Sequence, residues 1–352
     1  MPHFRCIMEI SAKQQNEDLD MMRIGIIGFG KMGQIRADVL EGIDDVEILS
    51  VYEPGECECK YERVSGPCII FTDSRIDAVF ICTPNKFNKE YAISALCNGK
   101  HVFCEKPPAF TASEVAEVIE AEKKSGKKLM YGFNHRHHGS IIRAKEVVDS
   151  GEFGKVLWMR GRYGKRITED QAAGWRMSKE ESGGGILLDQ GIHMLDLLMH
   201  FGGNFDVIQA IVSNLYWHLD IEDNAFVNLL NTETGVAASL HSTMTEWRFL
   251  FSLEIFLESG YIVINGLKTP SKSYGEEKLT LGKNVATPPS IEFDLQHTIY
   301  ENDRSWNVEM DHFLDAIRND APVVSGSSAD ALRVMTAIDE IYKNGTRQEI
   351  SE

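Results

Sequence analysis

The sequence predicts an α/β domain with a parallel sheet, followed by an α+β domain with a large, mostly antiparallel open sheet. From residue 22 to 136, short apolar runs alternate with amphipathic helical segments, which is typical of a parallel sheet covered on both faces. Beyond residue 136, longer runs alternate apolar and polar residues between glycine turns, which indicates antiparallel strands. We therefore place one domain at 22–136 and a second at 137–352, after a polar extension at 1–21.

Composition restricts the classes of partner. The chain has 352 residues, enough for two cores, and its formal net charge of -17 would repel nucleic acid and anionic lipid. The extension at 1–21 has no apolar run of signal-peptide length, and no later stretch approaches the ~20 apolar residues of a membrane span. We expect no nucleic-acid or membrane partner.

The cysteines indicate a reducing compartment. All seven lie between residues 6 and 104, and their number is odd. Cys57 and Cys59 form a CxC pair, which lacks the paired CxxC spacing of a structural zinc site. We expect reduced thiols and a cytoplasmic location.

The elements of the first domain follow in regular order. Thr111 and Glu114 have the spacing of a capping box and open a helix that ends at Gly126. The expected elements in this domain are strands at 23–28, 47–53, 77–84, 101–107 and 128–133, and helices at 31–42, 88–99 and 111–126.

The second domain begins with a helix at 140–151 and ends with helices at 307–320 and 327–345. Between them, runs at 155–164, 206–217, 224–244 and 251–266 have the period-2 pattern of strands. The last two runs each contain a turn, at 232–235 and 258–260, so each predicts a hairpin.

A glycine fingerprint lies at the first strand–helix junction. Gly28, Gly30 and Gly33 form GxGxxG, and Glu53 lies 20 positions later at the end of the next strand. The glycines alone also fit a methyltransferase loop or a plain tight turn; the strand, helix and acidic residue favour a dinucleotide site. Glu53 would accept hydrogen bonds from ribose hydroxyls and repel a 2′-phosphate, which favours NAD over NADP. The loop residues expected at the cofactor are Phe29, Lys31 and Met32.

Two further strand ends are expected at the cofactor. In a doubly wound sheet the ligand lies outside the carboxyl ends of the strands. Glu105 and Lys106 follow one such strand, so Lys106 is expected beside the nicotinamide, with Pro107 restricting its backbone. The alternative is a surface ion pair between Lys106 and Glu105. The other strand ends with Thr83, Pro84 and Asn85, which are also expected at the cofactor.

A second cluster of polar residues lies at 183–196, in GGGILLDQGIHMLD. Asp189, His193 and Asp196 share one face if this segment is helical. A metal site is one interpretation, but a third nitrogen or sulfur ligand is missing, so we expect no metal. A capping aspartate with a core histidine is the other alternative.

These motifs together resemble the glucose-fructose oxidoreductase and inositol dehydrogenase (Gfo/Idh/MocA) family. The resemblance rests on GxGxxG, TPN at 83–85, GKHVFCEKP at 99–107, GFNHR at 132–136, WR at 175–176 and DQGIHMLD at 189–196. It implies a Rossmann domain, then a substrate-binding and oligomerisation domain whose open sheet packs in homodimers or homotetramers. The chain departs from the family pattern at Asn88, where many members have a histidine, and in the short segment between Glu53 and Asp77.

The resemblance also assigns roles. Lys106, Asp189 and His193 are expected to act on a hydroxyl beside the nicotinamide. His193 suits the general base because its unperturbed pKa lies near neutrality; Asp189 would orient it, and Lys106 would stabilise the alkoxide. Asn134 is expected at the cofactor. The residues expected at the substrate, besides these catalytic three, are Arg136, Trp175 and Arg176.

The sequence thus predicts an NAD-dependent oxidoreductase acting on a secondary hydroxyl or keto group of a sugar, nucleotide sugar or cyclitol. Trp175 and Arg176 would close over this ligand; a buried indole with a surface arginine is the alternative. Two other functions stay open: a redox-neutral, glycosidase-like enzyme that retains NAD, and a non-catalytic sensor. No role is assigned to His135, His137 and His138.

Overall fold

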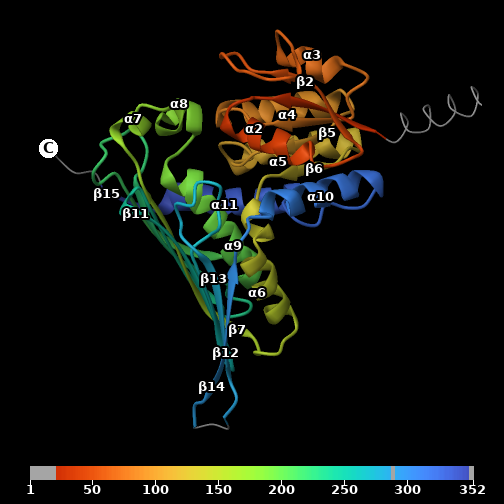
Figure 1. Ribbon diagram of the computed structural model, residues 1–352. Coiled ribbons are helices and arrows are strands. Elements are labelled where there is room, and N and C mark those ends of the chain that lie inside the picture. The colour runs from red at the N-terminus through yellow and green to blue at the C-terminus, as the bar shows by residue number, and fades with distance from the viewer. Residues whose placement is uncertain (1–20, 287–289, 349–352) are drawn as a thin grey trace, which may run out of the picture.

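The computed structural model describes residues 21–286 and 290–348, which form two sheets with helices packed on them (Figure 1). The predicted polar extension lies outside the described residues, apart from Met21. Within the described ranges, no helix is long and apolar enough to cross a bilayer. The α/β then α+β organisation predicted from the sequence is confirmed.

The first sheet has six parallel strands in the order β3-β2-β1-β4-β5-β6. Its central strand β4 is fully buried, because it has helices on both sides and its side chains are all apolar. The strands are β1 (Met22–Ile27), β2 (Val46–Tyr52), β3 (Glu62–Arg63), β4 (Ala78–Ile81), β5 (His101–Cys104) and β6 (Leu129–Tyr131).

The helices of this domain are α2 (Lys31–Leu40), α3 (Pro67–Thr72), α4 (Asn88–Cys97) and α5 (Ala112–Ser125). The predicted limits of α5 are confirmed. The Thr111 hydroxyl accepts the Glu114 N–H at 3.3 Å, and Gly126 ends the helix with a φ of 65°. The segment between Glu53 and Asp77 contains only the short β3 and α3.

The second sheet has nine strands in the order β14-β13-β12-β11-β7-β10-β9-β8-β15. Neighbours are antiparallel except β7 with β10 and β8 with β15. The two hairpins predicted at 224–244 and 251–266 are confirmed, whereas the strands after residue 266 were not predicted. The strands are β7 (Val156–Arg166), β8 (Val207–Ser213), β9 (Asn224–Leu230), β10 (Ala237–Thr243), β11 (Thr245–Leu257), β12 (Gly260–Asn265), β13 (Glu277–Asn284), β14 (Phe293–Tyr300) and β15 (Thr346–Gln348).

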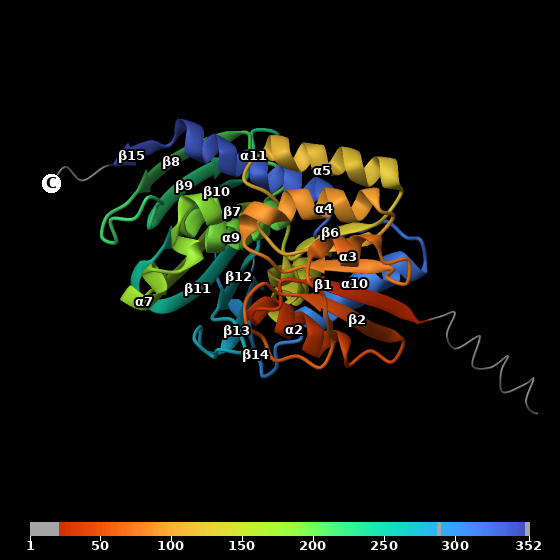
Figure 2. The same cartoon turned by 90° about the horizontal axis from the view of Figure 1, so that it is seen from above.

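Helices α6 (Gly139–Asp149) and α9 (Ile192–Gly202) lie along one face of this sheet (Figure 1). Helix α11 (Ser328–Asn344) packs against α5 of the first domain, α9 and β8, so it joins the two halves (Figure 2). Two short helices, α7 (Glu169–Ala172) and α8 (Lys179–Ser182), lie between β7 and α9 in the chain.

Helix α10 (Ser305–Arg318) returns to the first domain. Its residues Met310 and Phe313 belong to the same buried cluster as Ile24 and Phe80 of the first sheet. In Figure 1 it lies beneath that sheet. The boundary near residue 136 therefore divides the chain, but the core of the first domain includes a helix from the last fifty residues.

A buried arginine ties α10 to the end of β5. Arg36 of α2 is 0% exposed, and its guanidinium donates to Glu105 at 2.8 Å and to Glu309 of α10 at 2.6 Å. It lies between the rings of Phe103 and Trp306, 4.3 and 4.6 Å from their centroids. Burial raises the pKa of Glu309 to about 7 even though Arg36 opposes this. Arg36 thus holds two buried carboxyl groups, one of them on the residue before Lys106.

We predict that Arg36→Met lowers the free energy of unfolding by ~3–5 kcal/mol, because it leaves two buried carboxyl groups without their cation. Denaturant unfolding at pH 7 measures this. Adding Glu309→Gln should recover part of the loss. Arg75→Met, which breaks an exposed ion pair with Asp73, is the matched control and should change stability little. Equal stability of Arg36→Met and the wild type would contradict this role.

Candidate active site

The glycine loop has the shape of a dinucleotide cradle. Gly28 has a φ of 87°, and a Cβ there would lie 2.5 Å from the Cys82 carbonyl oxygen. A Cβ on Gly33 would collide with the Gly28 carbonyl. A Cβ on Gly30 would meet no described protein atom within 4 Å. Gly28 and Gly33 therefore shape the loop, while Gly30 leaves open space for a ligand to approach the backbone.

The N-terminus of α2 fits a pyrophosphate. Its N-cap, Gly30, has no side chain to cap the first N–H groups, and the first turn has no acidic residue. Lys31 and Met32 begin this helix. Glu53 lies beside the loop as predicted: its carboxylate accepts the N–H of Phe29 at 2.7 Å. These features match an NAD-type ligand, whose ribose would meet the Glu53 carboxylate.

Asn88 holds the backbone on both sides of Lys106. Its buried amide donates to the Glu105 carbonyl at 3.3 Å and to the Pro107 carbonyl at 2.8 Å, while Thr83 donates to its oxygen at 3.2 Å. The Lys106–Pro107 peptide bond is cis. No role was predicted for Asn88, whose side chain fixes the turn that carries Lys106.

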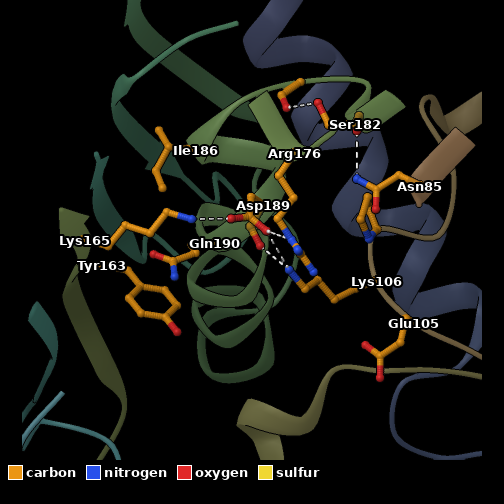
Figure 3. A network of polar contacts seen from close by, with 12 residues as sticks. Asn85, Glu105, Lys106, Tyr163, Lys165, Arg176, Ser182, Ile186, Asp189 and Gln190 are labelled. Carbon is orange, nitrogen blue, oxygen red and sulfur yellow. Dashed lines mark hydrogen bonds and ion pairs between the residues drawn. The ribbon is translucent and has the colours of Figure 1, made fainter. Parts of the chain in front are cut away.

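Lys106 does not pair with Glu105. The Glu105 carboxylate points away to Arg36, while the Lys106 ammonium lies 3.3 Å from Asp189 Oδ1 and also donates to the Asp189 carbonyl (Figure 3). The alternative of a surface ion pair between Lys106 and Glu105 is therefore wrong. Burial lowers the pKa of Lys106, and Asp189 opposes that effect.

Asp189 is the meeting point of three cations. It lies in a π-helical turn, Leu187–Gly191, that leads into α9; such turns often occur at functional sites. Its Oδ2 accepts from Lys165 at 2.6 Å, and Arg176 Nε lies 3.9 Å from its Oδ1. Burial would raise the pKa of Asp189, but Lys165, Lys106 and Arg176 hold it well below its usual range.

Lys165 was missed by the sequence analysis. Figure 3 shows it reaching Asp189 from the side opposite to Lys106. The signal for it was present: Tyr163 and Lys165 are two residues apart near the end of β7, so both side chains leave the strand on one face. Without the position of Asp189, that alternation did not indicate a partner for the lysine.

His193 lies in the same cluster and is 5% exposed. Its Nδ1 is buried without a hydrogen-bond partner among the described residues. Burial lowers the pKa of His193 well below its usual value, and the charge of Lys106 lowers it further. The imidazole is therefore neutral near pH 7, with a nitrogen left for a ligand.

The residue that orients His193 is not Asp189, the residue that was expected from the sequence. Within the described part of the chain no hydrogen bond joins it to Asp189. Its ring instead stacks on His135 at 3.8 Å between centroids, with 17° between the planes. His135 is fixed in turn by Tyr163, whose hydroxyl lies 2.9 Å from Nε2. Thus His135 orients the ring, and Asp189 binds the lysines.

The neighbouring histidines have partners in the protein. His138 Nδ1 lies 2.8 Å from the buried Glu277 carboxylate. The His137 ring meets that of His312 edge to face, with centroids 4.9 Å apart. In the described residues no group of three His, Cys, Asp or Glu side chains has the arrangement to hold a metal ion.

Arg136 does not join the cluster. Its guanidinium is 4% exposed and binds Asp196 at 2.5 and 2.7 Å and Asp330 at 3.1 Å. The expectation of a substrate-binding Arg136 is therefore corrected to a buried ion pair between the segment after β6, α9 and α11. Asp196 of α9 accepts from this arginine through both of its carboxylate oxygens.

Two predicted cofactor residues also have their amides occupied. Asn85 donates to the Ser182 carbonyl at 2.8 Å, which closes the segment before α4 onto α8 (Figure 3). Asn134 donates to the Ser305 hydroxyl at 3.1 Å at the start of α10. Pro84 comes directly before this segment, at the end of β4. Both amides are thus engaged with other parts of the protein.

A cavity of ≈ 280 Å³ is lined in part by Lys165 and Arg176, two of the cations near Asp189. Trp175 and Arg176 line it, and the Arg176 guanidinium lies 4.4 Å from the Trp175 ring. The remaining lining residues are Lys165, Arg166, Ile167, Gln171, Gly174, Met177 and Phe249. A larger cavity, of ≈ 1160 Å³, lies outside the cluster, against α8, β8 and α11.

Comparison with known families agrees with this geometry. Residues 22–133 match the model described as "Oxidoreductase family, NAD-binding Rossmann fold", and residues 141–263 match the "GFO/IDH/MocA C-terminal domain". The chain belongs to the Gfo/Idh/MocA family. The resemblance inferred from six short motifs is thereby confirmed, as is an NAD-binding first domain.

Similar proteins include a D-glucoside 3-dehydrogenase of Escherichia coli (strain K12), 32% identical over 201 residues, or 54% of this chain and 56% of that protein. The match thus spans little more than half of that relative. A scyllo-inositol 2-dehydrogenase (NAD(+)) of Bacillus subtilis (strain 168) is 25% identical over 92% of this chain and 95% of its own. A levoglucosan dehydrogenase in complex with NADH has the same fold, with a TM-score of 0.81 at 23% identity, covering 92% of this chain and 96% of its own.

Alanine substitutions in the glycine loop should separate its effect on protein stability from its effect on NAD binding. Gly33→Ala should lower stability by about 1–3 kcal/mol, because its Cβ meets the loop backbone. Gly30→Ala should fold normally yet bind NAD at least ~tenfold more weakly, because its Cβ enters the space for the pyrophosphate. Denaturant unfolding and calorimetric titration with NAD measure the two effects. An unchanged NAD affinity in Gly30→Ala would show that no cofactor approaches this residue.

Proposed function

We propose that this protein oxidises a secondary hydroxyl of a sugar or cyclitol with NAD, or reduces the corresponding ketone. The observation that carries the proposal is the meeting of the Lys106 ammonium, the ionised Asp189 and the neutral His193 at one place. The relatives named a D-glucoside 3-dehydrogenase and a scyllo-inositol 2-dehydrogenase support this class of substrate.

The residues divide the chemistry between them. NAD, when bound, supplies the acceptor for the hydride that leaves the carbinol carbon. His193 takes the hydroxyl proton as the C=O bond forms, since its imidazole is neutral and one buried nitrogen has no protein partner. Lys106 donates a hydrogen bond to the same oxygen and stabilises its developing negative charge. Asp189 keeps Lys106 and Lys165 in place.

For the cofactor we propose a preference for NAD over NADP. The Glu53 carboxylate is fixed by the N–H groups of Phe29, at 2.7 Å, and Gly55, at 3.1 Å, so it remains at the end of β2. There it would accept hydrogen bonds from a ribose diol and repel a 2′-phosphate. Arg63 lies nearby and donates to the Glu53 carbonyl at 2.8 Å.

We also propose that the second sheet forms a homodimer or homotetramer in the cytoplasm. Trp158, Ile211, Phe226 and Phe293 are between 40% and 48% exposed on β7, β8, β9 and β14. Such a concentration of apolar side chains on an open sheet favours contact with a second copy. The six cysteines of the described residues are unpaired, which supports a reducing compartment.

Incubating the protein with NAD and a panel of free hexoses, inositols, uronic acids and UDP-sugars tests the function. We expect reduced nicotinamide to accumulate with at least one member of the panel, measured by its absorbance. Product formation without net reduction would instead indicate a redox-neutral enzyme. Binding without either would indicate a sensor.

The control for this assay is Lys106→Met. It should bind NAD normally and fold normally, but lose roughly 100-fold or more in turnover, because one donor to the developing alkoxide is worth ~3 kcal/mol. Lys89→Met, at a surface ion pair on α4, should match the wild type. Full turnover by Lys106→Met would remove Lys106 from the mechanism.

The pH dependence of oxidation should follow His193. Because its pKa is lowered, the neutral base is present at pH 7 and is lost as the pH falls through that lowered pKa. The acid limb of kcat/KM should therefore lie below the usual value of about 6.5, and His193→Asn should abolish most activity together with the limb. His297→Asn, on the exposed β14, is the control. A limb retained by His193→Asn would assign the base to another group.

A further inference from the structure

We propose that the substrate is a single sugar or polyol unit that carries a carboxylate or phosphate, and that Arg166 and Arg176 bind this anionic group. The inference rests on the proposed function and narrows its substrate class. It places the reacting hydroxyl near Lys106 and His193, and the anionic group in the ≈ 280 Å³ cavity at the end of β7.

The cavity is cationic in an acidic protein. Three of its nine lining residues, Lys165, Arg166 and Arg176, carry a positive charge, and none carries a carboxyl group. The whole chain has 53 acidic residues against 36 lysines and arginines, so an average surface would have more carboxylates than cations. A concentration of one sign in a recess attracts ligands of the opposite sign.

The protein leaves most of this charge unbalanced. Lys165 has a carboxylate partner, Asp189 at 2.6 Å. Arg176 is 3.9 Å from that same carboxylate, and its side chain is 47% exposed. Arg166 has no ion pair with any residue of the described chain. Asp189 is already shared with Lys106, so it cannot balance all three cations, and Arg166 is exposed to a ligand from solvent.

The side chain of Arg176 is also held in place before a ligand binds. Its guanidinium rests on the Trp175 ring at 4.4 Å, which limits the rotamers that it loses on binding. A guanidinium binds carboxylate or phosphate oxygens through two parallel, charge-assisted hydrogen bonds, which are stronger than its hydrogen bonds to a neutral hydroxyl. Two arginines at one recess therefore distinguish an anionic sugar from its neutral counterpart.

The volume limits the size of the ligand. Pockets for drug-sized molecules measure about 300–1,000 Å³, so a cavity of ≈ 280 Å³ has room for a small anionic group and part of one sugar ring. The diphosphate, ribose and base of a nucleotide-linked sugar would together exceed this space. We therefore expect a carboxylate or a single phosphate in the cavity.

The first arm of the test compares matched substrates. The NAD-saturated enzyme is assayed with D-glucose, D-glucuronate and D-glucose 6-phosphate, and with the corresponding D-galactose series. An anionic member should exceed its neutral counterpart in kcat/KM by at least about tenfold, as expected for a charge-assisted contact. The uronate and phosphate arms identify which anionic group the arginines prefer.

The second arm uses variants. Arg166→Gln should lower kcat/KM for the preferred anionic substrate by about tenfold or more, yet change it less than about twofold for the neutral sugar. Arg176→Gln should lower kcat/KM more for the anionic substrate than for the neutral one, because Arg176 also lies near Asp189. Arg160→Gln is the matched control, because Arg160 lies on the same strand but binds Glu254 outside the cavity. It should alter neither value. Equal losses on neutral and anionic substrates would overturn the proposal.

Calorimetric titration of the NAD-saturated protein tests the binding of an anionic sugar separately from the proposed dehydrogenase activity. D-glucuronate or D-glucose 6-phosphate should bind more tightly than D-glucose, and Arg166→Gln should remove the difference. If neutral sugars are oxidised as well as their anionic counterparts, the anionic inference is wrong and the proposed dehydrogenase function stands. If no sugar is oxidised, the proposed function fails, and the titration alone decides whether the cavity binds anions.

Discussion

The carboxylate of Asp189 is the contact on which the arrangement of the site depends. It receives Lys106 from the end of the first sheet and Lys165 from the second, so one side chain determines the distance between two domains at the point of chemistry. Burying a carboxylate is costly, and this one is retained only because two lysines and an arginine surround it. A separation of the domains would leave that charge without its partners.

A second set of buried contacts keeps Lys106 at its position. Asn88 binds the carbonyls on either side of the lysine, and Arg36 draws the Glu105 side chain away from it. Arg36 is in turn bound to Glu309 of α10, a helix that arrives some 270 residues later in the chain. Residues distant in sequence therefore fix the orientation of one ammonium, which reduces the reorganisation that catalysis would require.

The sequence was informative where the signal is local. Fully buried strands such as β4 read as apolar runs, Thr111 marks a helix start, and Gly28 and Gly33 have side-chain positions that no larger residue can occupy. These features were predictable because the pattern that marks each one occupies a few consecutive positions, although the contact that keeps Gly28 small comes from Cys82, far along the chain.

Long-range features were not predictable in this way. The amphipathic pattern of α10 shows that it buries one face, but not that the face covers the first sheet. The different partners of Asp189 and Asp196 were also not predictable, because the spacing of the two residues places them on one face of a regular helix without indicating what each would meet. In the structure, Asp196 binds Arg136 and Asp189 binds lysines. The ion pair of Arg136 could be identified only from the packing of α9 and α11 against the segment after β6.

The same contacts decide which residue suits the role of base. Asp189 is ionised, but its cations hold its pKa so low that it accepts a proton poorly, and its oxygens are occupied by lysines. His193 is also kept from protonating, yet by burial and by the charge of Lys106, and its Nδ1 has no partner among the described residues. When a hydroxyl loses its proton beside Lys106, the new negative charge offsets the ammonium, and the main charge opposing protonation of His193 is reduced. Before the reaction, the charge of Lys106 helps to keep His193 neutral. As His193 takes the hydroxyl proton, the alkoxide offsets that charge, so Lys106 opposes protonation of His193 less. This favours His193 over Asp189 as the proton acceptor.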